Sequence, residues 1–173
     1  MKSNVVSFIN MKGGVGKTTL AVNVGYTLSK EFGKKVLLID VDPQMNATQY
    51  TLNNSQVKYI MENPKSSLYG ILYEIDLPAV TSSQSKENKN NTIISINNNF
   101  DIIPSHLGLM SLDLDKHPYK LKQYMKDNNL KSKYDTVIMD LPPTISIYTM
   151  ISLLASDHYL VPIKTDYLSF FGL

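Results

Sequence analysis

The chain has 173 residues, of which 43% are apolar, so it can form one domain with a sizeable core. It has no cysteine, which excludes disulfides and cysteine-ligated metal clusters and favours a cytoplasmic protein, and it has no apolar run long enough to span a membrane. The net charge of +2 is too small to indicate nucleic-acid binding by itself, and because all 17 basic residues are lysines the chain cannot supply an arginine finger.

The first predicted elements are a strand, a glycine-rich loop and a helix. Val5–Ile9 forms a short apolar run typical of a buried strand. Apolar residues then recur at helical spacing within a helix predicted from about Gly16 to Phe32, with Gly33 suited to the position just past its end. The loop between them therefore stands in the strand–loop–helix context that a phosphate-binding loop requires.

The residue types in this loop predict a magnesium–nucleotide site. Glycines allow the backbone N–H groups to approach phosphate oxygens, and the positive end of the helix points at the same place. Lys17 supplies a charge for the β- and γ-phosphates, and the Thr18 hydroxyl is placed to bind Mg²⁺. The predicted loop residues are Gly13, Gly14, Val15, Gly16, Lys17, Thr18 and Thr19.

A second buried strand, Val36–Ile39, completes a strand–helix–strand unit and leads into Asp40 and Asp42. Open parallel sheets bind ligands at the carboxyl ends of their strands, where these two acids fall. Two nearby carboxylates need a cation or another role, which favours a magnesium–nucleotide site. A helix N-cap together with a surface acid is the alternative, and the spacing alone leaves both open.

The middle of the chain is less informative. One short amphipathic helix is expected around 68–75, and residues 81–99 are predicted to form an exposed loop, with a possible small edge strand at 92–96. The run 100–103 predicts the next strand. A helix is expected between about 107 and 129, with an interruption at Pro118 and with Leu107 and Met110 among its buried residues.

The third informative stretch is a buried strand, Val137–Met139, that ends at Asp140 before two prolines. An acid at this point is typical of a Walker B site, where it lies beside Mg²⁺ opposite the phosphate loop. A helix over 145–155 and another strand over 158–162 are expected to follow.

Three ordered motifs together resemble those of the ParA/MinD family of P-loop ATPases. They are Lys-Gly-Gly-Val-Gly-Lys-Thr-Thr at 12–19, Asp-Val-Asp-Pro-Gln at 40–44 with Asn-Ala-Thr at 46–48, and Asp-Leu-Pro-Pro at 140–143. The first is similar to the deviant Walker A motif, in which Lys12 stands at the front and Met11 replaces the usual first glycine. Met45 stands where the family usually has glycine. Of the two branches, the chain is more similar to the ParA-type, Soj-like partition ATPases.

The resemblance implies a three-layer α/β/α fold with a mostly parallel, twisted sheet, and one P-loop domain over residues 1–173. The strand and helices that normally follow in the family are missing, so we expect a chain truncated at its C-terminus. Residues that contact adenine and DNA are expected beyond Leu173.

The resemblance also implies roles for individual residues. Lys12 would reach across a dimer to the partner's nucleotide, and Asp42 would orient the attacking water. The predicted catalytic residues are thus Lys12, Lys17 and Asp42. The predicted metal-site residues are Thr18, Asp40 and Asp140.

The function implied is a dimeric switch for plasmid or chromosome partition that binds ATP or ADP with Mg²⁺ and hydrolyses ATP. The ATP-bound dimer would bind DNA nonspecifically, and a ParB-like partner would stimulate its ATP hydrolysis. The protein would then be cytoplasmic and associated with the nucleoid. A MinD-like, membrane-associated regulator of the division site is the alternative, although it needs an amphipathic C-terminal helix that this chain lacks. An enzyme of the related iron-protein or amide-ligase type is a third hypothesis, but the iron-protein version needs cysteines, which the chain does not have. A nonhydrolysing binding module is a fourth, and the intact lysines and acids of the three motifs argue against it.

Overall fold

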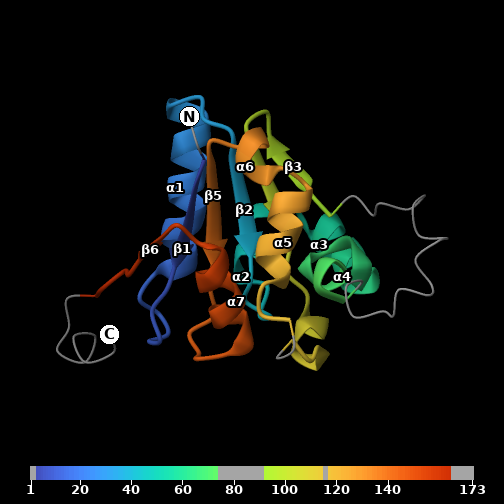
Figure 1. Ribbon diagram of the computed structural model, residues 1–173. Coiled ribbons are helices and arrows are strands. Elements are labelled where there is room, and N and C mark those ends of the chain that lie inside the picture. Colours follow the sequence, from blue (N-terminus) through green and yellow to red (C-terminus); the bar gives the residue numbers. More distant parts are fainter. Residues whose placement is uncertain (1–2, 74–91, 115–116, 165–173) are drawn as a thin grey trace.

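The computed structural model describes residues 3–73, 92–114 and 117–164. Within these residues the strands form one sheet of six, in the order β3-β4-β2-β5-β1-β6 (Figure 1). All neighbouring strands are parallel except β3 and β4. The strands are β1 (Asn4–Phe8), β2 (Val36–Asp40), β3 (Ile94–Asn97), β4 (Phe100–Ile103), β5 (Thr136–Asp140) and β6 (His158–Leu160). The predicted α/β fold with a mostly parallel sheet is confirmed.

Helices cover both faces of this sheet, because alternate side chains of each strand point to opposite faces. On β2, Val36 and Leu38 belong to a core shared with α1 and α2, whereas Leu37 and Ile39 belong to a second core shared with α4, α5 and α7. The main helices are α1 (Lys17–Glu31), α2 (Asn46–Thr51), α4 (Leu68–Tyr73), α5 (Lys120–Asp127), α6 (Leu130–Lys133) and α7 (Ile147–Ala155). The three predicted layers are therefore present.

The strand register brings the informative stretches to one edge of the sheet. Asp140 at the end of β5 lies opposite Phe8 of β1 on one side and Asp40 of β2 on the other. The loop after β1 and the loop after β2 consequently leave the sheet at the same end as Asp140. In Figure 1 this end lies at the bottom of the molecule.

The helix expected between about 107 and 129 is confirmed only after its interruption at Pro118, and its first part is wrong. The structure has a short 3₁₀ helix, η4 (Leu107–Ser111), followed after Pro118 by α5 and α6. The His106 side chain accepts a hydrogen bond from the Gly108 N–H and fixes the tighter turn. Because the α-helical spacing does not apply there, Leu107 and Met110 are 48% and 68% exposed rather than buried.

The stretch after Thr48 has more structure than the sequence indicated. It contains α3 (Asn54–Glu62), which begins with a capping box between Asn53 and Gln56, and η1 (Pro64–Ser66) in addition to α2 and α4. Most of the loop predicted over 81–99 lies outside the described residues. Its last part includes β3, which agrees with the small edge strand expected there.

Candidate nucleotide site

The loop between β1 and α1 has the backbone conformation that a phosphate cradle needs. Gly14 and Gly16 have φ angles of 74° and 88°, in the left-handed region that favours glycine. A Cβ atom added at Gly13, Gly14 or Gly16 would meet nothing within 4 Å, so the loop borders open space. An anion can therefore approach this backbone closely, at the positive end of α1.

Asn10 anchors the loop at its entrance, a role that the sequence did not indicate. Its buried side chain donates to the Pro162 carbonyl at 2.9 Å and accepts from the Lys12 N–H at 2.8 Å. The loop is thereby tied to the segment after β6, 152 residues away in sequence. Lys12 itself is half-buried within the loop.

Lys17 begins α1 and is only 7% exposed. Burial lowers the pKa of its ammonium group, while the charges of Asp140 and Asp42 act in the opposite direction. The structure thus brings three of the predicted residues into electrostatic contact. Of the others, Val15 and Thr18 are half-buried and Thr19 is exposed.

Asp40 is fully buried and has several hydrogen-bond donors. One oxygen accepts from the Thr48 hydroxyl at 2.6 Å and from the Thr48 N–H at 2.7 Å, and the other accepts from the Asp42 N–H at 3.2 Å. Thr48 lies in the first turn of α2, so Asp40 caps this helix from the end of β2. Burial, together with the charge of Asp140, raises the pKa of Asp40 to about 8.

Asp42 lies closer to the surface and is 6% exposed. Its side chain accepts from the Gln44 N–H at 2.9 Å, and its own N–H is held by Asp40. The next turn passes through Met45, which has a φ angle of 60°. Methionine therefore adopts here the left-handed conformation for which glycine is the usual residue.

Asp140 differs from Asp40 in its hydrogen bonding within the described residues. It is fully buried, and within the described part of the chain neither of its carboxylate oxygens makes a hydrogen bond. Burial raises the pKa of Asp140 to about 6. The Thr18 hydroxyl lies near enough to oppose this rise, although it forms no hydrogen bond of normal geometry with either oxygen. The charge of Asp42 adds to the rise and that of Lys17 opposes it.

A buried carboxylate without donors is expected to bind a cation. The described residues contain no group of three or more His, Cys, Asp or Glu side chains that could enclose a metal ion. A site with a single carboxylate ligand fits Mg²⁺, which commonly uses one or two protein ligands and completes its shell with waters and substrate phosphates. Thr18 and Asp140 are the residues that fit such an ion, beside a loop that fits the phosphates.

Comparison with known proteins identifies the family of the chain. A family model described as "AAA domain" (AAA_31) matches residues 3–173. The sporulation initiation inhibitor protein Soj of Bacillus subtilis is 32% identical over 178 residues, covering 98% of this chain and 61% of Soj. The chain belongs to the ParA/Soj family of P-loop ATPases.

Solved structures of similar proteins include nucleotide complexes. A plasmid partition protein from Borrelia burgdorferi B31, bound to AMPPNP, has a TM-score of 0.79 and 29% identity, covering 99% of this chain and 67% of that one. Cobyrinic acid a,c-diamide synthase from Mycobacterium smegmatis, with bound ADP and magnesium, has a TM-score of 0.76 and 26% identity, covering 99% and 64%. The fold is therefore shared by partition proteins and by an amide-forming enzyme.

The chain spans about 60% of the length of the curated ParA/Soj relatives that it matches. In the part of the chain that the structure covers, no helix combines the length and the hydropathy needed to cross a membrane.

Proposed function

We propose that the protein containing this chain is an ATP-driven partition switch, in which Mg²⁺-ATP holds two copies together and ADP releases them. The observation that carries the proposal is the buried, unpartnered carboxylate of Asp140 beside Lys17, at the edge where the phosphate loop begins. Membership of the ParA/Soj family supports the partition role. The ATP-bound dimer would bind DNA nonspecifically, and a ParB-like partner would stimulate hydrolysis.

The chain's own residues divide the work of hydrolysis among them. The loop N–H groups and Lys17 bind the phosphates, and Lys17 and the partner copy's Lys12 would stabilise negative charge on the transferred group. Asp42, near the surface of the same edge, would orient the attacking water. Bound Mg²⁺, held by Thr18 and Asp140, would neutralise phosphate charge, and Asp40 would support its shell through Asp42.

Exposed apolar residues at this edge support a partner that covers it. Ile145, which follows the two prolines after Asp140, is 90% exposed, and Met110 in η4 is 68% exposed. Both segments follow strands that end at the phosphate-loop edge. Exposed apolar side chains near a charged site are typical of an interface, here with a second copy.

The test uses the natural gene product that contains this chain. It is mixed with duplex DNA or with anionic liposomes, in Mg²⁺-ATP or Mg²⁺-ADP, and the sedimented protein is measured. Retention by DNA with ATP and release with ADP is the expected result. Retention by liposomes would favour the division-site alternative, and retention by neither would refute the DNA claim.

Variants separate binding from hydrolysis in the same assay. Lys17→Ala is expected to abolish nucleotide binding, whereas Asp42→Ala should bind ATP, hydrolyse it slowly and stay on DNA longer. Lys34→Ala is the matched control, because Lys34 is an exposed lysine just after α1 and outside the site. Normal turnover by Asp42→Ala would remove this carboxylate from the proposed mechanism.

A further inference from the structure

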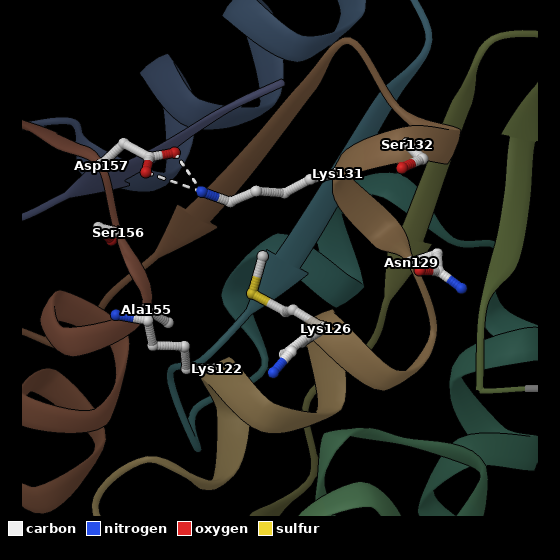
Figure 2. Close-up of a pocket in the computed structure, with 9 residues that line it drawn as sticks. Lys122, Lys126, Asn129, Lys131, Ser132, Ala155, Ser156 and Asp157 are labelled. Carbon is white, nitrogen blue, oxygen red and sulfur yellow. Dashed lines mark hydrogen bonds and ion pairs between the residues drawn. The ribbon is translucent and has the colours of Figure 1, made fainter. Parts of the chain in front are cut away.

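A pocket of about 320 Å³ lies between α5, α6 and the turn that joins α7 to β6 (Figure 2). Its floor is apolar and consists of Met125 and Ala155, which are 3% and 4% exposed. The turn at Asp157 leads into β6 and bonds to the start of β1 through Val5. The pocket therefore lies at the opposite edge of the sheet from the phosphate loop, and the nucleotide site does not use it.

Positive charge is concentrated around this pocket. The segment 120–133, which forms α5 and α6, has five lysines and one aspartate, whereas the rest of the chain has twelve lysines and fourteen acidic residues. Lys122 and Lys126 from α5 and Lys131 from α6 all line the pocket. Figure 2 shows Lys122 and Lys131 extending from these two helices toward the α7–β6 turn.

Lys131 has a structural role in the folded chain. Its ammonium group contacts both oxygens of Asp157, at 2.7 and 2.6 Å, and so joins α6 to the start of β6. Asp157 also accepts the Val5 N–H at 2.9 Å. This pair forms one wall of the pocket and fixes its shape.

Lys122 and Lys126 have no comparable role. Both are exposed, and neither makes an ion pair with any described residue. They are four positions apart on α5, so their charges repel each other, and Lys122 lies in the first turn, where a positive charge opposes the helix dipole. Since no described residue neutralises these two charges, the pair is complementary to a negatively charged ligand outside the fold.

We propose that this pocket docks an acidic peptide segment of a partner protein. An apolar side chain would enter the pocket over Met125 and Ala155, lined also by the aliphatic stems of the lysines, and carboxylates beside it would pair with Lys122 and Lys126. A pocket of this volume is at the lower end of the range for ligand sites and has room for one apolar side chain of a bound segment.

The pocket's shape and charge favour a peptide over DNA. A phosphate backbone is bound by a basic surface and needs no concave apolar floor. The Asp157 carboxylate in the wall is already paired with Lys131, so Lys122 and Lys126 are the lining charges left for the acidic side chains of a peptide. An acidic peptide with one apolar residue uses both the floor and the lysines.

The test measures fluorescence polarisation of a short labelled peptide in which glutamates flank one leucine. The protein is expected to bind it, and replacing the leucine by serine in the peptide should weaken binding about tenfold because the floor is no longer covered. The double variant Lys122→Glu with Lys126→Glu should also bind at least about tenfold more weakly. Ser132→Glu, at the exposed rim on α6, should weaken binding without changing either lysine.

The matched control is Lys30→Glu with Lys34→Glu, which changes the net charge equally at exposed positions away from the pocket. It should bind the peptide as the unmodified protein does. Equal weakening by the control, or no binding of the peptide at all, would overturn the proposal. Displacement of the peptide by duplex DNA, together with no effect of the leucine-to-serine change, would also overturn it and would identify a general polyanion surface. None of these readouts needs a nucleotide, so their outcome is independent of the partition proposal.

Discussion

Replacing Thr48 by valine tests how the acidic edge of the nucleotide site is held together. The Thr48 hydroxyl donates to Asp40 at 2.6 Å and accepts from the Ser105 N–H at 2.9 Å. All three residues are fully buried. The hydroxyl therefore connects the end of β2, the start of α2 and the segment after β4, and through Asp40 it fixes the N–H of Asp42.

The expected cost follows from the hydrogen bonds lost, because valine has nearly the same shape as threonine. Losing the bond to Asp40 costs about 1 kcal/mol, and leaving the buried Ser105 N–H without its acceptor costs about 1–3 kcal/mol, so Thr48→Val should lower the free energy of unfolding by about 2–4 kcal/mol. Thr48→Ser keeps the hydroxyl and loses one methyl group, which costs only about 1 kcal/mol.

Urea unfolding of the nucleotide-free protein at neutral pH compares the two variants with the unmodified chain. Thr48→Ser should be clearly more stable than Thr48→Val. If the two variants unfold at the same urea concentration, or if valine is the more stable, the hydroxyl does not connect these segments and Asp40 is held in another way.

Two further predictions concern the same edge. Met45→Ala should lower the free energy of unfolding by about 2–4 kcal/mol because the buried side chain is lost. Met45→Gly should be about 1 kcal/mol more stable than the alanine variant, because glycine relieves the left-handed strain at φ 60°. The urea midpoints of the two variants rank them, and an equal or reversed ranking would mean that the turn stores no strain. Burial raises the pKa of Asp140 to about 6, so the folded chain binds a proton at this carboxyl more tightly than the unfolded chain does. The stability that the bound proton contributes is present below about pH 4 and is lost as the pH rises through 6. Relative to Asp140→Asn, the unmodified nucleotide-free chain should therefore lose about 2 kcal/mol of unfolding free energy between pH 4 and pH 6, and about 3 kcal/mol in total once the pH is well above 6. Unfolding in EDTA at several pH values measures this loss, and parallel pH profiles would contradict it.

The sequence was sufficient to predict the features that depend on residues close together in the chain. Apolar runs without alternation predicted β2 and β5 as buried strands. The glycines of the loop predicted a tightly turning backbone, and Gly14 and Gly16 have the positive φ angles of such a turn. The order of these elements then placed the acids at one edge of the sheet, since parallel strands all end on the same side.

Features that depend on contacts distant in sequence could not be predicted in the same way. The bond from Asn10 to the Pro162 carbonyl spans 152 residues, and the bond from Ser105 to Thr48 spans 57. No local pattern marks either pair. The 3₁₀ turn at η4 was missed for a different reason, because its apolar residues also satisfy α-helical spacing, and only the cap by His106 distinguishes the two.

The acids at the ends of β2 and β5 show how the structure separates roles that the sequence left open. Asp40 and Asp140 are register partners on adjacent strands, and both are fully buried. Asp40 accepts hydrogen bonds from Thr48 and Asp42, so the helix-capping alternative describes what its side chain does in the folded chain, and its support of a metal shell stays a prediction. Neither oxygen of Asp140 makes a hydrogen bond to a described residue, although Thr18 and Lys17 lie near it, and a buried carboxylate in that state is stabilised as an anion by a cation. The hydrogen bonds thus make Asp140 a better candidate than Asp40 for a direct ligand of Mg²⁺, and the metal roles of both residues stay predictions.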